Sequence, residues 1–387
     1  MTEWTKVKLG DIATFSNGIN FGKDSYCQGV KLIGVSDFGN RFYPDYSSLQ
    51  EVKTEVVRNN DYLKNGDIVF VRSNGNKELV GRCMLIAGCH PFVTFSGFCI
   101  RARLNDTSKF NPLYFAYHFK NMEFRKAMSG TAVGANIQNL SQGRLAQYET
   151  MVPNIAVQNK IAAILSRYDD LIENYQKQIK LLEEAAQRLY KEWFVDLHFP
   201  GHENVKVVDG VPEGWENVSV GSLVSKVHRT KQIPTSKVLA EGDIPVIDQS
   251  RTFIAGYTND KEALIKVDKP VIVFGDHTRI LKYITFSFAK GADGTQLILS
   301  NNLKRMPQSL FYCSLVNVDL SNYSYARHFK YLKAEDIVLP TEQIASDFDK
   351  HTSLCFEKIH KLRSQLRLLT EARDRLLPKL MSGEIEV

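Results

Sequence analysis

Few residues of this 387-residue chain have the types and spacing that a catalytic centre needs. Asp276 and His277 are adjacent in the segment FGDHTR and could exchange a proton. No Ser or Cys nucleophile motif, metal-ligand set or Walker-type phosphate loop accompanies them in the sequence. We expect a turn here that binds a phosphate or a base edge through Thr278, Arg279 and Lys282, or else an ordinary structural turn.

A second segment, Asn111-Pro112-Leu113-Tyr114, is similar to the N-P-P-Y motif with which adenine methyltransferases hold a flipped base. Leu113 replaces the second proline, and no F-x-G-x-G loop of the kind that holds S-adenosylmethionine precedes it. Asn followed by Pro is also a common helix start, because the Asn side chain caps free N–H groups. We therefore expect a helix from this point and a non-enzymatic chain, with a remnant methyltransferase acting through Asn111 and Tyr114 as an alternative.

Composition narrows the class of protein. The hydrophobic content of 43% and charged content of 24% are those of a folded protein, and the length suits two domains plus connectors. The six cysteines form no C-x-x-C pair and have no histidine at zinc-site spacing, so we expect buried, reduced thiols and no metal. The sequence has neither a signal peptide at its start nor a run of about 18 apolar residues. We expect a soluble cytoplasmic protein.

Two polar loops, residues 129–153 and 322–340, are rich in amide, hydroxyl, imidazole or guanidinium groups, which can bond to base edges. The net charge of +6 is compatible with nucleic-acid binding but does not establish it. Chemistry and loop position select these candidate DNA contacts: Arg72, Asn74, Lys77, Arg82, Asn136, Gln138, Arg144, Arg229, Lys231, Thr278, Arg279, Lys282, Arg327, His328 and Lys330. About half of them should be surface or phosphate contacts, because phosphate and sugar take half to two-thirds of protein–DNA hydrogen bonds.

These candidates lie in two globular segments that share a plan. The first opens at residues 4–12 (WTKVKLGDI) and the second at residues 215–223 (WENVSVGSL). Apolar runs at 67–75, 92–104 and 271–288 read as strands, and helix starts follow at Asn111 and Pro307. Each segment is therefore expected to be a strand-rich, mixed α/β body with a helix late on.

A long helix is predicted from Asn159 to Phe194, with apolar residues alternating at spacings of four and three, and the pattern returns from Phe348 to Leu380. This is the seam of a coiled coil. Each helix would be roughly 50 Å long, and the long connection permits an antiparallel pair within one chain. The seam consists of Ile161, Leu165, Tyr168, Ile172, Tyr175, Ile179, Leu182, Leu189, Trp193, Phe348, Ile359, Leu362, Leu366, Leu369, Leu376 and Leu380.

The duplicated plan, VPNIAVQNKIAAIL before the first long helix, LYKEWFVDLHFPG after it and the terminal RDRLLPKLMSGEIEV together resemble the specificity subunit of Type I restriction-modification enzymes. IVFGDHTRILKY is similar to one recurrent recognition-domain type of that family. The family usually has P-x-x-E-Q before each long helix; here Val157 precedes Gln158, and Glu342-Gln343 follows Pro340 one position closer. These departures affect the helix entrance and not the recognition surface.

The resemblance implies an α+β protein with target-recognition domains at 1–152 and 201–339 and conserved helices at 153–200 and 340–387. Each domain would read one half of a bipartite, asymmetric DNA site, and the antiparallel coiled coil would set the spacer. Two modification subunits would dock on the helices, and restriction subunits would complete the complex. S-adenosylmethionine, ATP and Mg would be needed only by those partners, which would carry out adenine methylation and cleavage.

For the partner interface we expect the outward faces of both helices, with Trp193 and Phe194 as aromatic anchors. Alternatively, both aromatic side chains close the coiled coil, and Trp193 continues the seam. A stand-alone coiled-coil DNA-binding or anti-restriction protein, without methyltransferase partners, is the alternative function.

Overall fold

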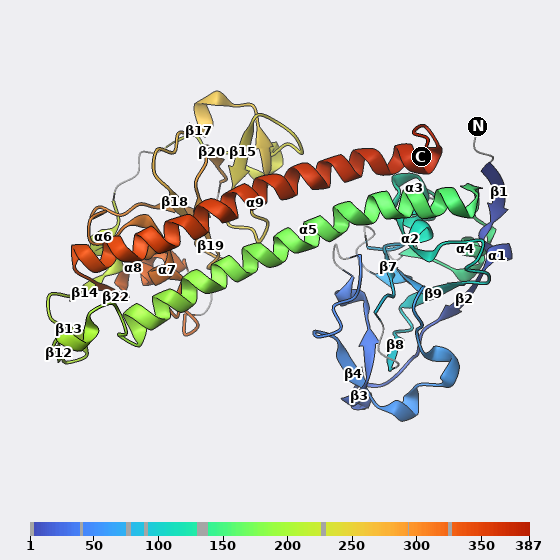
Figure 1. Cartoon of the computed structure of the whole chain (residues 1–387), viewed down its shortest axis with the longest axis horizontal. Helices are drawn as coiled ribbons and strands as arrows, with labels where there is room; N and C mark the ends of the chain where they lie inside the picture. The colour runs from blue at the N-terminus through green and yellow to red at the C-terminus, as the bar shows by residue number, and fades with distance from the viewer. Residues whose placement is uncertain are drawn as a thin grey trace. The chain divides into compact units, whose positions relative to one another are not determined.

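The computed structural model describes residues 4–38, 42–74, 79–88, 92–129, 138–225, 230–292, 294–323 and 327–387. The chain divides into two compact units, Met1–Ile172 with Leu368–Val387, and Glu173–Arg367. Each unit therefore combines a globular part with a part of each of two long helices, α5 (Ile155–Tyr190) and α9 (Glu342–Ser382), drawn in green and red in Figure 1.

The first unit contains two main sheets. One has the order β2 (Ala13–Asn17), β9 (Cys99–Leu104), β5 (Ile68–Val71), β7 (Cys83–Leu85) and is antiparallel. The other has the order β4 (Gln50–Val52), β3 (Tyr26–Ile33), β8 (Val93–Phe95), with β3 and β8 parallel. The remaining elements are the pairs β1 (Trp4–Lys8) with β11 (Glu149–Pro153) and β6 (Ser73–Asn74) with β10 (Gln138–Asn139), and helices α1 (Leu9–Ile12), α2 (Pro112–Lys120), α3 (Met122–Ser129) and α4 (Gln142–Gln147).

The second unit is built in the same way. Its antiparallel sheet has the order β19 (Leu281–Ile284), β18 (Val271–Gly275), β21 (Thr295–Ile298). Its second sheet has the order β16 (Gly256–Thr258), β15 (Ile244–Ile247), β20 (Phe288–Lys290), β17 (Leu264–Ile265), with β15 and β20 parallel. The remaining elements are the pairs β12 (Val207–Val208) with β13 (Val211–Pro212) and β14 (Glu216–Ser219) with β22 (Asp336–Leu339), and helices α6 (Val220–Leu223), α7 (Gln308–Val316) and α8 (His328–Ala334).

Equivalent backbone contacts confirm the internal duplication. In the first unit the opening strand β1 pairs with β11, directly before α5; in the second, β14 pairs with β22, directly before α9. The amide of Leu9 donates to the carbonyl of Tyr148 at 2.9 Å, and the amide of Val220 donates to that of Glu335 at the same distance. The two units therefore share one frame with different interiors.

The predicted start of α2 at Asn111 is confirmed. The Asn111 side-chain oxygen accepts hydrogen bonds from the amides of Leu113 (2.8 Å) and Tyr114 (3.2 Å), and Pro112 occupies the first turn. Tyr114 is fully buried among the core side chains. Its ring is thus packed inside the unit and not placed for stacking on a flipped base, which removes the basis for the methyltransferase alternative.

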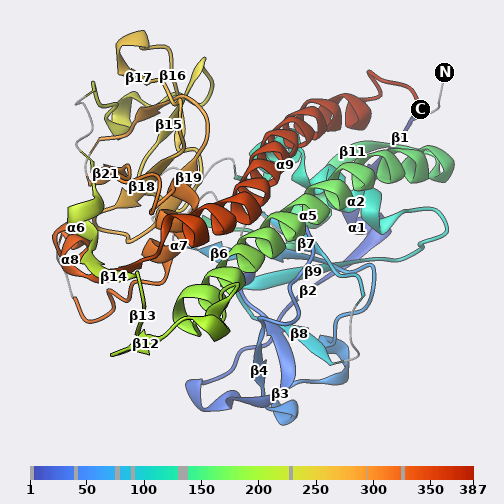
Figure 2. The same ribbon diagram turned by 60° about the vertical axis from the view of Figure 1, so that its left-hand side comes forward.

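The predicted seam is also confirmed, since every seam residue named above is buried or half-buried. The helices run antiparallel within each unit. In the first unit Arg373 of α9 bonds to Asp169 of α5, and in the second Arg363 of α9 bonds to Glu183 of α5 at 2.7 Å, so a later residue of one helix meets an earlier residue of the other. Figure 2 shows the two helices side by side from a second direction.

The structure corrects the role expected for Trp193 and Phe194. Both lie in the π-helical turn Lys191–Val195 at the end of α5 and are only 7% and 4% exposed. Their rings pack against Phe348 of α9, with centroids 5.9 and 5.1 Å apart, and Phe194 also contacts Trp215. Both aromatic side chains therefore close the helix pair of the second unit and do not form an exposed partner anchor.

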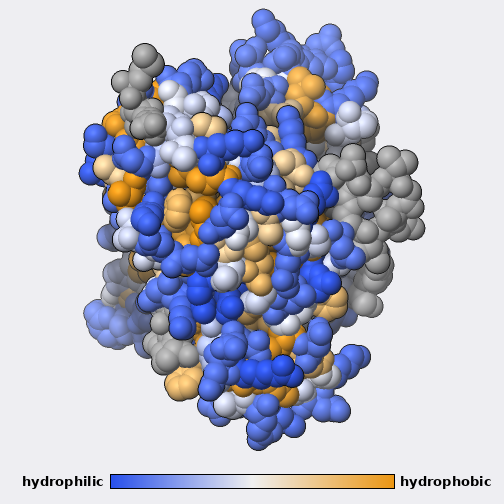
Figure 3. Space-filling view, turned by 90° about the vertical axis from the view of Figure 1, so that its right-hand side faces the viewer, coloured by the Kyte–Doolittle hydropathy of each residue, from blue (hydrophilic) through white to orange (hydrophobic). Residues whose placement is uncertain are grey.

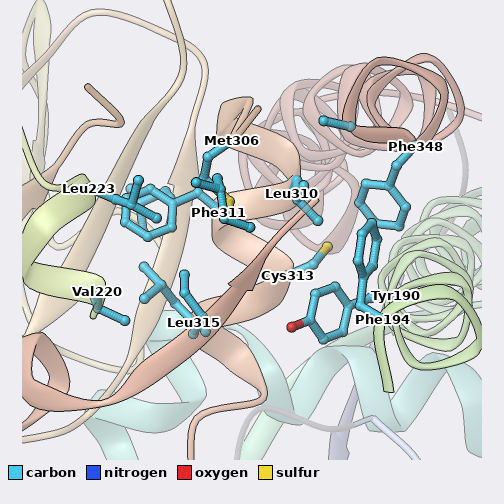
Figure 4. Packing of buried hydrophobic residues seen from close by; sticks show 14 of the residues in the cluster. Tyr190, Phe194, Val220, Leu223, Met306, Leu310, Phe311, Cys313, Leu315 and Phe348 are labelled. Atoms are coloured by element: carbon cyan, nitrogen blue, oxygen red, sulfur yellow. The ribbon is translucent and has the colours of Figure 1, made fainter. Parts of the chain in front are cut away.

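In the second unit, helix α7 connects the sheet to the long helices (Figure 4). Leu310 and Cys313 point toward the Phe348, Tyr190 and Phe194 side, while Phe311 and Leu315 point toward α6. A helix that is apolar on both sides is expected where two layers cover it. This core holds the sheet, and hence the loops at its ends, in a fixed position relative to the helix pair of the same unit.

The entrance to each long helix is secured by a different side chain. Buried Gln158 donates to the carbonyl of Pro153 at 2.8 Å and accepts from the amide of Asn111 at 2.9 Å. In the second unit the corresponding carbonyl, that of Pro340, accepts from Nε of Arg305 at 2.7 Å. The departure from the family's usual P-x-x-E-Q sequence thus leaves the helix entrance satisfied in both copies.

One face of the molecule is mainly polar, and the cysteines that the structure describes are free thiols. The face drawn in Figure 3 is mostly hydrophilic, with hydrophobic patches broken by polar side chains. Cys83, Cys99 and Cys313 are buried free thiols as expected, but Cys355 is half-buried and Cys27 is exposed. Cys89 lies outside the described residues. Within the described ranges no group of three or more His, Cys, Asp or Glu side chains could hold a metal ion, and no helix is long and apolar enough to cross a membrane.

Candidate nucleic-acid interface

In the first unit the candidate DNA contacts gather where the central strand β5 ends. The chain passes from Val71 through Arg72 into β6, which pairs with β10, so that Asn74 lies opposite Gln138. The amide of Leu140 then donates to the carbonyl of Arg72 at 2.9 Å. The fold therefore brings residues far apart in sequence to one edge. The side chains of Asn74 and Gln138, and Lys77 and Asn136 altogether, lie outside the described residues.

The described arginines of this edge are partly engaged within the protein. Arg72 donates from Nη1 to the carbonyl of Gly97 at 3.3 Å and stays half-buried. Arg82 is half-buried beside it, its carbonyl accepting from the amide of Val71. Arg144 donates from Nη2 to the carbonyl of Ala127 at 2.8 Å and thereby ties α4 to the last turn of α3. Arg144 thus acts first as a positioning residue.

In the second unit the corresponding strand β18 ends in a tight turn. The amide of Gly275 donates to the carbonyl of Ile280, and the amide of Arg279 donates back to that of Gly275, each at 2.8 Å. Arg279 has a φ of 59°, a conformation that costs a non-glycine residue on the order of 1 kcal/mol. Thr278 Oγ1 donates to the carbonyl of Gln249 at 2.7 Å, which fixes the turn against β15.

Asp276, the neighbour of His277 in the sequence, is bound to the start of α8 together with His328. The Asp276 carbonyl accepts the amide of His328 at 2.9 Å, and its carboxylate accepts the amide of Phe329 at 2.8 Å. The His328 ring nitrogens lie 2.9 Å from the Asp276 carbonyl and 3.0 Å from that of Tyr323. His328 is 3% exposed, so it joins β18 to the start of α8 and is not presented to a base as we expected.

Two lysines of the second unit are likewise bound to other groups of the protein, and the burial of Lys282 contradicts its prediction as a DNA contact. Lys282 is 4% exposed and donates to the carbonyls of Asp248 (2.8 Å) and Thr252 (2.6 Å); burial lowers its pKa to about 8. Lys231 lies between the carboxylates of Asp260 and Glu262, at 2.8 and 2.9 Å, and hydrogen bonds to both raise its pKa. Arg229 lies outside the described residues.

The remaining candidates of the second unit are exposed at one place. Arg327 is the residue before α8 and Lys330 lies in its first turn, and both side chains are exposed. Arg279 is nearby in the fold, because its guanidinium donates to the carbonyl of Tyr323, four residues before Arg327. These three candidate cations of the second unit therefore lie at the junction of the β18 turn and α8.

Sequence reasoning missed Gln249. Its backbone carbonyl holds Thr278, and its side-chain oxygen accepts the amide of His277 at 3.1 Å. The residue follows strand β15, which belongs to the other sheet, and only the polar run after the apolar segment IPVI could have marked it. It lies beside the β18 turn because the two sheets meet there.

The two edges use the same backbone connections. The amide of Arg72 donates to the carbonyl of Phe98 at 2.8 Å, and the amide of Asp276 donates to that of Gly294 at 2.6 Å. Each of the residues Arg72 and Asp276 then accepts, through its own carbonyl, an amide from the entry to the late short helix, α4 or α8. One frame thus presents two different sets of side chains.

Comparison with known proteins identifies this repeated frame. Residues 1–184 match the family model described as the Type I restriction modification DNA specificity domain. The specificity subunit of the MjaIX Type I restriction enzyme from Methanocaldococcus jannaschii is 29% identical over 304 residues, which cover 71% of this chain and 69% of that protein. Residues 1–184 thus match a Type I restriction modification DNA specificity domain, and the chain is similar to Type I restriction enzyme specificity subunits.

Other Type I restriction enzyme specificity subunits are similar to the chain over greater lengths. The HindI specificity subunit from Haemophilus influenzae is 22% identical in an alignment that covers 100% of both chains. Among solved structures, the S subunit of a Type I restriction-modification system from M. genitalium is 18% identical and matches with a TM-score of 0.62, over 98% of this chain and 96% of that one. That likeness confirms the fold class: two similar α+β domains with a pair of long helices.

Proposed function

We propose that this chain is the DNA sequence-specificity subunit of a Type I restriction-modification complex. Each unit would read one half of a bipartite, asymmetric DNA site at the edge where its central strand meets its late short helix. The main support for this proposal is the repeated frame, since the same backbone connections hold Arg72 in one unit and Asp276 in the other. A duplicated frame with non-identical side chains suits an asymmetric bipartite sequence.

The exposed cations fit such a role by their chemistry. Arg279, Arg327 and Lys330 lie at one junction and can neutralise phosphates or donate to guanine in the major groove. Lys282, His328 and Arg144 bond inward and so act by holding this junction and its counterpart in place. Rigid support of the reading side chains favours discrimination, because little ordering is then needed on binding.

The helix pair would act as the spacer between the half-sites and as the platform for partners. Half-sites that a protein reads from one face of DNA lie about 34 Å, one helical turn, apart. Because Trp193 and Phe194 are buried, we propose that modification subunits contact apolar side chains that the long helices expose. These are Leu171, Leu181, Leu354 and Leu368, which are 42%, 63%, 66% and 55% exposed. We propose these four leucines as candidate partner contacts.

In this proposal two modification subunits dock on the helices and restriction subunits join them, all in the cytoplasm. Methyl transfer to adenine and ATP-driven cleavage would be carried out by those partners, which would also bind S-adenosylmethionine, ATP and Mg. The chain itself would contribute recognition and positioning only.

Adenine-methylation mapping across the genome tests this function. Cells that express the chain with its modification subunit should show methylation in a bipartite motif with a fixed gap, and cells lacking the chain should not. Methylation that persists with the modification subunit alone would refute the specificity role. Specific DNA binding without any effect on methylation would instead support the stand-alone DNA-binding protein.

A further inference from the structure

Phe98 is an exposed aromatic side chain within the polar edge of the first unit. It occupies the turn between β8 and β9, and 62% of its surface is exposed. Its carbonyl accepts the amides of Arg72 at 2.8 Å and Ser73 at 3.4 Å. The turn that carries this exposed ring therefore lies directly beside β6, in the strand pair that carries the candidate base-reading residues.

The backbone under Phe98 is fixed by neighbouring groups. The amide of Gly97 donates to the carbonyl of Ile19 at 2.7 Å, and the amide of Cys99 donates to that of Ser96 at 2.8 Å. A Cβ atom on Gly97 would lie 2.1 Å from the side-chain oxygen of Asn20, so the turn is closely packed as well as bonded. An exposed ring on such a turn is pre-organised for contact and loses little freedom on binding.

The second unit has a different group at the same place. Gly294 occupies the position of Phe98, because its carbonyl accepts the amide of Asp276 as that of Phe98 accepts the amide of Arg72. Gly294 has a φ of +70°, and a Cβ atom there would lie 2.8 Å from the His277 ring and 2.9 Å from the Gln249 amide. The first unit thus presents an apolar ring where the second presents an imidazole and an amide.

The apolar group that the base edges present in the major groove is the methyl group of thymine. Each base edge there offers hydrogen-bond donors and acceptors, and thymine alone adds a methyl group. Polar neighbours of Phe98 can bond to donors and acceptors of the bases, whereas the ring itself is suited to covering an apolar group such as that methyl. The difference between Phe98 and Gly294 therefore suits two half-sites that differ in the presence of a thymine methyl group at this position.

We propose that Phe98 is a specificity-determining residue that contacts the 5-methyl group of a thymine in the half-site read by the first unit. The inference rests on the proposed function and assigns one base pair of one half-site to one side chain. The second unit, with Gly294 in the same place, makes no such contact.

Selection of binding sites from randomised duplex DNA tests the assignment. The complete complex with its modification subunits is compared with the same complex carrying Phe98→Ala. The wild type should select a bipartite motif, and the variant should lose its preference at a single A·T position of one half-site by about tenfold, within the range that one base pair contributes. The other half-site should be unchanged, which also reports that the variant is folded.

A second measurement isolates the methyl group. Replacing the thymine of that position by deoxyuridine in the selected duplex should weaken binding by the wild type and leave Phe98→Ala unaffected. Phe92→Ala is the matched control, because Phe92 is 60% exposed in the same unit but packs edge-on against Tyr62 at the other end of β8. It should behave as the wild type in both experiments.

Two results would overturn the proposal while leaving the function intact: an unchanged motif for Phe98→Ala, or a loss of preference at a G·C position. A wild-type complex that selects no bipartite motif would overturn the proposed function as well.

Discussion

Arg373 of α9 and Asp169 of α5 form an ion pair in the first unit, with Nη1 of the arginine 2.5 Å from Oδ1 of the aspartate. The hydroxyl of Tyr117 donates to the second carboxylate oxygen at 2.6 Å, so this one side chain joins both long helices to α2. The aspartate side chain is 12% exposed and the arginine 26%. The pair therefore lies between a surface ion pair and a fully buried one.

Asp169→Asn should destabilise the first unit by about 2 kcal/mol, less than a fully buried pair because water partly screens the arginine. Urea unfolding followed by fluorescence measures the change. Lys177→Ala is the control, since its pair with Glu173 has side chains 70% and 55% exposed and should contribute little. Equal effects of the two substitutions would contradict a special role for the pair.

Lys282 predicts an unusual dependence of stability on pH. Because burial lowers its pKa from 10.5 to about 8, the unfolded chain binds more protons than the folded chain between about pH 8 and 10. The free energy of unfolding should therefore rise with pH in that window, relative to the variant Lys282→Met, and be flat below it. Urea titrations at several pH values measure this difference. A difference that falls or stays constant would show that the lysine titrates normally.

Lys330 should affect DNA binding and not stability. Its side chain is exposed in the first turn of α8, so Lys330→Ala should weaken binding to all sequences alike and reduce the slope of log affinity against log salt by about 1. Fluorescence anisotropy at a series of salt concentrations gives the slope. The neighbouring His328→Ala should instead lower stability by about 1–3 kcal/mol, since it leaves the carbonyls of Asp276 and Tyr323 without the imidazole.

Substitutions at Trp193 and Leu181 test the core and the proposed partner interface separately. Trp193→Ala should lower the free energy of unfolding by about 3–5 kcal/mol, as expected for a large buried side chain at 7% exposure. Leu181 is 63% exposed, so Leu181→Ala should leave stability within about 0.5 kcal/mol while weakening assembly with modification subunits. Thermal unfolding and analytical ultracentrifugation measure the two effects. Undiminished assembly would place the partner contact elsewhere.

The sequence allowed the repeated elements to be predicted, because their signals are local. The seam from Ile161 to Leu380 follows from spacing alone, and the start of α2 follows from Asn111 and Pro112. The repetition of the opening strand and of the segment before each long helix made the duplicated frame predictable as well.

Burial of polar side chains could not be predicted in the same way. Alternation along β19 places Tyr283 on the face of the helix core and Lys282 on the other face, but it does not reveal that the second sheet covers that face. The acceptors of Lys282 lie about thirty residues earlier, on the segment after β15. The burial of His328 was likewise not predictable, because its partner Asp276 lies far away in the sequence, in the turn after β18.

The entrances to the two long helices differ in the side chain that donates to the proline carbonyl. Gln158 reaches the carbonyl of Pro153 from inside α5, whereas Arg305 reaches the carbonyl of Pro340 from a loop before α7. What the duplicates retain is the proline carbonyl that must be paired, and the donor is free to come from another part of the chain. Either donor closes the same kind of joint, so the two halves of the chain keep one architecture at this point without keeping one sequence motif.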